Sequence, residues 1–177
     1  YKVCADINDV TYKTVHLNPD FSLDASRLLA ATDEQTKVIF LCSPNNPTGN
    51  DLDTQAVKQV LDTFGGITVI DEAYVDFADR PSYLKVLDQY PNLIVLQTFS
   101  KAWGMASVRL GMAFANPAII RFFNTVKYPY NINLLTQRFV SEALEQANQT
   151  RQWVAMLVAE RAVIAKELAR LPLIKQI

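Results

Sequence analysis

Seven side chains that can do chemistry follow three short apolar runs of the sequence. The first run leads into Ser-Pro-Asn-Asn-Pro-Thr-Gly, the second ends in Asp-Glu-Ala-Tyr, and the third leads into Thr-Phe-Ser-Lys. The side chains are Asn46, Asp71, Tyr74, Thr98, Ser100, Lys101 and Arg109. They supply an amide, a carboxylate, a phenol, two hydroxyls, an ammonium and a guanidinium. This set predicts a site for an anionic ligand that also has a basic ring nitrogen or a carbonyl.

Two parts of this set point to particular chemistry. An arginine fork beside Ser or Thr hydroxyls suits a phosphate, because charge-assisted bidentate bonds hold it in one orientation. A lysine such as Lys101 at a buried strand end can lose its proton through desolvation, which makes its amine nucleophilic toward an aldehyde. Cys4, Cys42 and the single histidine, His16, show no metal-ligand spacing, so we expect no metal site.

The elements that must position these residues alternate between β-branched runs and amphipathic stretches, which is typical of a parallel sheet covered by helices. Several runs are apolar throughout, as strands buried on both faces are. We therefore predict an α/β fold, a mostly parallel sheet with helices on both faces. The predicted strands are 2–5, 13–17, 37–42, 67–71, 93–99 and 111–115. Ligands of such sheets lie beyond the carboxyl ends of the strands, where the seven side chains stand.

Helices are predicted between and after the strands. Asp53 can cap a helix over 54–64, and Gly65-Gly66 can stop it. Further helices are predicted over 82–89, 117–126, 134–147 and 149–171. The last keeps one side apolar and suits a connector helix that leads toward a small domain. We expect residues 1–150 to form a partial large domain and residues 151–177 to form the connector and the start of the next domain, with a strand beginning at 172–177.

Composition excludes some classes of function. The chain has 177 residues, 17 basic against 18 acidic, and a net charge of −1, which offers no field to attract nucleic acid or an anionic membrane. Its apolar runs are too short to span a bilayer. We expect a cytoplasmic protein with reduced cysteines, truncated at both ends.

Each motif also has an ordinary structural explanation. Asp71 alone could cap the following turn, the asparagine-rich segment could be a simple turn cluster, and Lys101 with Arg109 could be solvated surface cations. Glu72 is expected to be structural. For Tyr128, Tyr130 and Asn131, loop packing and a contact with a partner subunit both remain open. The functional interpretation depends on all three motifs occurring at successive strand ends.

In this order, Ser-Pro-Asn-Asn-Pro-Thr-Gly, Asp-Glu-Ala-Tyr and Thr-Phe-Ser-Lys followed by an arginine resemble the fold-type I aminotransferases that depend on pyridoxal 5'-phosphate (PLP). The resemblance implies that Lys101 is the catalytic Schiff-base lysine, which also moves the proton between the substrate's α-carbon and the cofactor. It implies that Asp71 pairs with the pyridine nitrogen and keeps the ring protonated.

The same resemblance implies how the rest of the cofactor is held. Asn46 and Tyr74 would bond to the phenolic oxygen of PLP. Thr98, Ser100 and Arg109 match the phosphate-binding positions. The Ser-Val-Arg sequence at 107–109 departs from the Gly-Leu-Arg of many relatives, which puts the local loop shape in doubt.

Within the family, the Pro-Tyr-Asn-Ile-Asn segment at 129–133 and the Lys-Ala-Trp-Gly-Met context are similar to the histidinol-phosphate aminotransferase group. This implies L-histidinol phosphate as amino donor, 2-oxoglutarate as acceptor, histidine biosynthesis, and a homodimer. Alternatives are another class I/II aminotransferase, a threonine-phosphate decarboxylase-like PLP enzyme, the non-catalytic PLP-binding sensor domain of a transcription regulator, and a purely structural α/β fragment.

Overall fold

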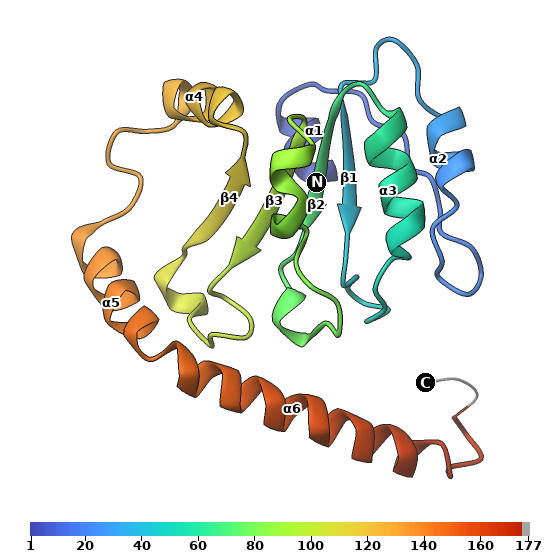
Figure 1. Cartoon of the computed structure of the whole chain (residues 1–177), viewed down its shortest axis with the longest axis vertical. Helices are drawn as coiled ribbons and strands as arrows, with labels where there is room; N and C mark the ends of the chain where they lie inside the picture. Colours follow the sequence, from blue (N-terminus) through green and yellow to red (C-terminus); the bar gives the residue numbers. More distant parts are fainter. Residues whose placement is uncertain (175–177) are drawn as a thin grey trace.

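A four-stranded sheet in the order β1-β2-β3-β4 lies at the centre of the computed structural model, which describes residues 1–174 (Figure 1). The strands are β1 (Val38–Cys42), β2 (Ile67–Asp71), β3 (Leu93–Thr98) and β4 (Gly111–Ala115). The first three are parallel, and β4 runs antiparallel to β3. The predicted α/β class with a mostly parallel sheet is confirmed.

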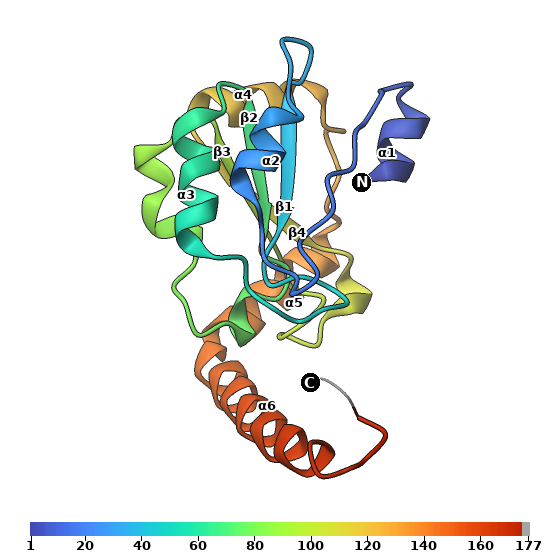
Figure 2. The same cartoon turned by 90° about the vertical axis from the view of Figure 1, so that its right-hand side faces the viewer.

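The central strands β2 and β3 are mostly apolar and partly or fully buried along their length, as expected in the middle of a sheet flanked by helices. Figure 2 shows α2 (Ala25–Ala30) and α3 (Thr54–Thr63) on one side of the sheet and α1 (Lys2–Ile7) on the other. The main core lies between the sheet and the α2/α3 layer. Its fully buried side chains include Val57, Val60, Ile70, Leu93 and Val95.

Helix α3 forms where the sequence predicts it. The Asp53 carboxylate accepts a hydrogen bond from the Ala56 amide at 2.9 Å and so satisfies one free N–H of the first turn. The helix buries Val57, Val60 and Leu61 against the sheet. The preceding α2 was not predicted, although Asp24 caps it in the same way.

Two predicted strands are wrong. Residues 2–5 belong to α1, which satisfies its own backbone, beginning with the bond from the Ala5 amide to the Tyr1 carbonyl at 3.0 Å. Residues 13–17 belong to no helix and pair with no strand of the described chain. The strands β1 and β4 each leave one edge of the sheet free, but neither run pairs there, because a run of four or five residues does not specify its own conformation. The helix predicted over 82–89 is a 3-10 helix, η2 (Tyr83–Gln89).

Three helices follow the sheet, as predicted: α4 (Pro117–Val126), α5 (Leu134–Glu145) and α6 (Ala147–Leu168). In Figure 1, α6 passes below the carboxyl ends of β1 and β3, and α5 lies to the left, beside the start of β4. The long helix predicted over 149–171 is therefore present as α6, and much of its apolar surface, including Met156 and Ile164, is exposed. Of the strand expected at 172–177, residues 172–174 are turn and coil, and 175–177 lie outside the described residues. No helix of the described chain is long and apolar enough to cross a membrane.

Candidate functional site

Asn46, Tyr74 and Lys101 come together from three different loops at the carboxyl ends of β1, β2 and β3. The Asn46 Nδ2 donates a hydrogen bond to the Tyr74 hydroxyl at 2.9 Å. The Lys101 Nζ lies 5.0 Å from the centroid of the Tyr74 ring. The Lys101 ammonium, and after it the Asn46 amide, lower the pKa of the Tyr74 phenol. A cation, a phenol and an amide donor therefore share one small area.

The loop that carries Asn46 is folded by its own polar groups. The Asn45 amide donates to the Asn50 carbonyl at 2.9 Å, and the Gly49 amide donates to the Asn45 carbonyl at 2.7 Å. Gly49 has a φ of +75°, a conformation that glycine adopts without a Cβ clash. The motif is thus a closed turn that projects Asn46 beyond the strand end.

Asp71 ends β2 opposite Cys42 of β1, so its carboxylate lies at the same edge of the sheet. One carboxylate oxygen, Oδ1, accepts a hydrogen bond from the Ala73 amide at 3.0 Å. The other, Oδ2, accepts one from the Tyr1 hydroxyl. Burial and this hydrogen bond raise the pKa of the Tyr1 phenol. A carboxylate can accept about four hydrogen bonds, so Asp71 retains acceptor capacity.

Sequence reasoning missed Tyr1 because it assigned the segment after it to a strand. The Tyr1 ring stacks on Phe40 with centroids 4.3 Å apart and planes 21° apart. From its position against Phe40 of β1, the phenol of Tyr1 reaches Asp71 at the end of the neighbouring strand β2. No local pattern in the sequence indicates this contact, which joins residues 70 positions apart.

The turn between β3 and β4 brings the backbones of Thr98, Ser100 and Arg109 close together. Thr98 pairs with Gly111 in the antiparallel ladder, and the Ser100 amide donates to the Thr98 Oγ1 at 3.1 Å. Arg109 has a φ of +52°. Its exposed guanidinium donates to the Ala106 carbonyl at 3.0 Å, within its own turn. The described chain shows no side-chain bond between Arg109 and the two hydroxyls, although all three lie at the same corner.

Arg80 and Asp51 are further polar residues that the sequence did not single out. The Arg80 guanidinium donates to Asp51 at 2.8 Å and to the buried Glu72 at 2.9 Å. Glu72, expected to be structural, is 1% exposed and lies in this cluster, directly after Asp71. In the sequence, Arg80 stands in a polar turn next to proline, which is typical of a solvated residue.

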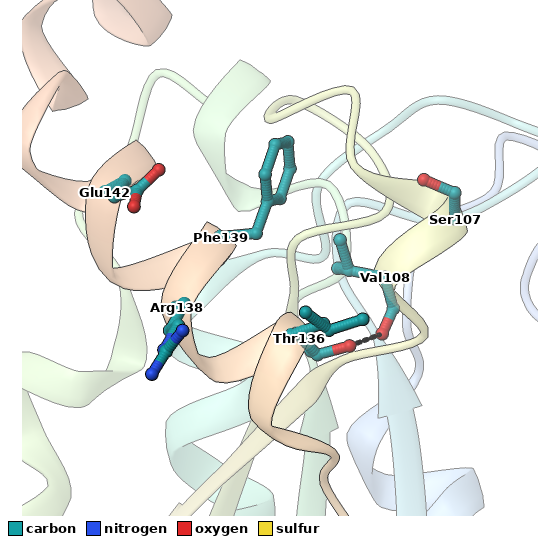
Figure 3. Close-up of a pocket in the computed structure, with 7 residues that line it drawn as sticks. Ser107, Val108, Thr136, Arg138, Phe139 and Glu142 are labelled. Carbon is teal, nitrogen blue, oxygen red and sulfur yellow. Dashed lines mark hydrogen bonds between the residues drawn. The ribbon is translucent and has the colours of Figure 1, made fainter.

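A hollow of about 470 Å³ lies beside the site, between the turn that precedes Arg109 and helix α5 (Figure 3). The Thr136 hydroxyl donates to the Val108 carbonyl at 3.4 Å and links the two walls. The lining residues are Ser107, Val108, Leu135, Thr136, Arg138, Phe139 and Glu142. None of the seven predicted site residues lines it, so the hollow is a neighbour of the candidate site and not part of it.

Comparison with known proteins agrees with this architecture. The family described as Aminotransferase class I and II matches residues 1–174. The chain is 52% identical over 177 residues to the histidinol-phosphate aminotransferase of Bacteroides fragilis, and 53% identical over 171 residues to that of Bacteroides thetaiotaomicron. These alignments cover 100% and 97% of the chain but 51% and 49% of the relatives. The chain thus spans about half the length of the curated relatives it matches.

Two crystal structures share the fold. The histidinol-phosphate aminotransferase of Clostridium acetobutylicum superposes with a TM-score of 0.92 at 21% identity, over 99% of this chain and 54% of that one. The Sinorhizobium meliloti histidinol-phosphate aminotransferase in complex with pyridoxal-5'-phosphate gives 0.84 at 25% identity, over 95% and 47%. Because the family match runs over residues 1–174 and the Bacteroides relatives align along nearly the whole chain, the chain belongs to the class I and II aminotransferase family.

Proposed function

We propose that the chain is part of a PLP-dependent transaminase, the histidinol-phosphate:2-oxoglutarate aminotransferase of histidine biosynthesis. The observation that carries the proposal is the meeting of Asn46, Tyr74 and Lys101 at the carboxyl ends of three adjacent strands. The names of the Bacteroides relatives support the choice of amino donor.

The donor set fits the cofactor at each of its polar groups. PLP, when bound, supplies a protonated pyridine ring that withdraws electrons from the substrate's α-carbon. Lys101 would bind the cofactor's aldehyde carbon through Nζ and carry the proton to and from the α-carbon. Asp71, with a carboxylate held by the Ala73 amide, would accept the hydrogen bond of the pyridinium. Asn46 and Tyr74 already contact each other and would donate to the phenolic oxygen.

The phosphate is assigned to the corner formed by Thr98, Ser100 and Arg109. Two hydroxyls and a guanidinium suit a dianion, because charge-assisted hydrogen bonds are the strongest available. Arg109 is exposed and bonded only to a carbonyl of its own turn in the described chain, so it can turn toward a phosphate without breaking an ion pair.

The rest of the proposal concerns the whole protein. Residues 1–150 would form part of the cofactor-binding domain, and residues from 151 onward would connect it to a second domain. A cytoplasmic location and a homodimer are proposed; the homodimer is supported by large apolar side chains of the segment after β4 that face solvent, among them Phe122 at 73% exposure and Leu135 at 78%. Light scattering of the full-length protein tests the dimer, and a monomeric mass would contradict it.

The function is tested on full-length protein with PLP and a panel of amino donors: histidinol phosphate, aspartate, phenylalanine and O-phosphothreonine, each with 2-oxoglutarate. Histidinol phosphate should give the highest kcat/KM. Borohydride reduction followed by mass spectrometry should locate the phosphopyridoxyl group on Lys101. Lys101→Ala should abolish turnover, whereas Lys85→Ala, at an exposed lysine of η2, should retain it. Label on another lysine, or equal activity of the two variants, would contradict the proposal.

A further inference from the structure

One buried guanidinium, that of Arg80, holds together segments that are distant in sequence. The Arg80 side chain is only 10% exposed. Its Nη2 donates to the Ser43 carbonyl at 2.7 Å, its Nε to the Asp51 carboxylate at 2.8 Å, and its Nη1 to the Glu72 carboxylate at 2.9 Å. We call these four residues the Arg80 cluster. Their positions in the chain differ by up to 37 residues.

Two members of the cluster stand at opposite ends of the loop that carries Asn46. Ser43 begins this loop and Asp51 ends it. The Ser43 hydroxyl also donates to the Asp51 carboxylate at 3.0 Å, so the two ends are joined directly as well as through Arg80. The guanidinium therefore closes the base of the loop and limits where its tip, with Asn46, can lie.

The third member, Glu72, connects the cluster to the strand end that carries Asp71. Glu72 accepts hydrogen bonds from the Ser82 hydroxyl at 2.5 Å, the Tyr83 amide at 2.9 Å and the Gln97 amide group at 3.0 Å, in addition to the guanidinium. Each carboxylate oxygen has two partners: Oε1 accepts from the Arg80 guanidinium and the Tyr83 amide, and Oε2 accepts from the Ser82 hydroxyl and the Gln97 side chain. A fully satisfied buried network of this kind permits one arrangement of the backbone around it.

The Arg80 cluster is better explained as fixing the arrangement of its residues than as adding to the stability of the fold. A buried ion pair contributes little net stability, because desolvation offsets most of the attraction, but it restricts its partners to one arrangement. The planar fork of arginine reaches Ser43, Asp51 and Glu72 at once, and the single ammonium of a lysine cannot match this fork.

We propose that Arg80, together with Glu72, is a positioning residue: it clamps the loop base and the β2 end so that Asn46 and Tyr74 converge on one ligand oxygen. This role rests on the proposed function in one respect, because the ligand oxygen is taken to be the phenolic oxygen of PLP. Arg80 itself donates no hydrogen bond to any of the seven site residues within the described chain.

The experiment uses full-length protein and compares Arg80→Lys with Tyr83→Phe as the matched control. The control removes one oxygen atom from the buried neighbour of Arg80 but keeps its ring, whose centroid lies 4.5 Å from the Arg80 Cζ. Hydrogen–deuterium exchange of residues 43–51 is measured in cofactor-free protein. PLP affinity and the pH midpoint of the bound cofactor's absorbance change are measured after loading.

Arg80→Lys should raise exchange of residues 43–51 about tenfold and weaken PLP binding about tenfold, as expected when one or two charge-assisted bonds to the loop base are lost. The absorbance midpoint should rise, because poorly placed Asn46 and Tyr74 no longer stabilise an anionic ring oxygen. Tyr83→Phe should change none of these. If Arg80→Lys does not fold, Asp51→Asn replaces it, because the Asp51 side chain is 31% exposed and its substitution disturbs the core less. The same measurements should then show smaller effects in the same direction.

Exchange equal to that of Tyr83→Phe would overturn the positioning role. An unchanged midpoint in a variant that is merely less stable would also overturn it, because the cluster would then act on stability alone. If the wild type retained no PLP, the proposed function would fail, while exchange in cofactor-free protein would still decide whether Arg80 positions the loop.

Discussion

Tyr83→Phe should stabilise the protein, because the Tyr83 hydroxyl is buried and has no hydrogen-bond partner in the described chain. The side chain is 9% exposed, and its ring packs against the Arg80 guanidinium. A buried polar group without a partner costs about 1–3 kcal/mol. Phenylalanine keeps the ring and removes this cost. At neutral pH we therefore expect the free energy of unfolding to rise by about 1 kcal/mol, the lower end of that range.

The same variant should have a larger effect at alkaline pH. Burial raises the pKa of Tyr83 to about 12, against 10.0 for a free tyrosine. The unfolded chain therefore releases this proton at a lower pH than the folded chain does. The corresponding stability is fully present below pH 10 and is lost as the pH rises through 12, and a difference of 2 units corresponds to roughly 3 kcal/mol. Tyr83→Phe has no such proton, so its advantage over the wild type should grow across this window.

Urea unfolding at a series of pH values from neutral to about 11 measures both effects. Tyr12→Phe serves as control, since Tyr12 is 46% exposed and its removal should leave the curve of the wild type unchanged. A loss of stability in Tyr83→Phe at neutral pH would show that the hydroxyl has a partner in solution. A constant difference between the variants from neutral to alkaline pH would refute the reasoning from the raised pKa.

Two other substitutions test one contact at the site and one contact at the opposite, amino ends of the strands. Tyr1→Phe removes the hydroxyl that donates to Asp71 but keeps the stack on Phe40, so PLP affinity of the full-length protein, followed by equilibrium dialysis, should fall about three- to tenfold; unchanged affinity would mean that Asp71 is held by other groups. Gly66→Ala places a Cβ 2.6 Å from a backbone carbonyl oxygen and should cost about 1–3 kcal/mol in thermal unfolding. Gly65→Ala, with nothing within 4 Å, is its control, and equal losses in both would contradict the steric explanation.

The strands of the sheet could be predicted because their sequences are continuous apolar runs between turn residues. Ile67–Asp71 and Leu93–Thr98 are buried on both faces. Such strands can be recognised from their own apolar composition, without knowing which elements pack against them. The runs at 2–5 and 13–17 have similar composition over fewer buried positions, and here the prediction was wrong. Whether such a run pairs with an edge of the sheet depends on where the rest of the chain places it, which the run itself does not encode.

The grouping of the site residues could also be predicted, because the carboxyl ends of parallel strands meet at one edge whatever the details of packing. Asn46, Tyr74 and Lys101 are in fact neighbours there. Their individual contacts could not be predicted. The hydrogen bond from Asn46 to Tyr74 depends on the shape of a loop whose base is hydrogen-bonded to Arg80.

The sequence by itself thus determined the class of fold, the strand ends and the family, since each of these can be recognised from local composition and short motifs. Only the tertiary structure decided that Tyr1 reaches Asp71 and that Arg80 is buried between Ser43, Asp51 and Glu72. The physical reason is the same in both cases. A hydrogen bond between residues dozens of positions apart depends on where whole elements pack. The local sequence of a polar residue in a turn is the same whether its hydrogen bonds are made with water or with a buried carboxylate.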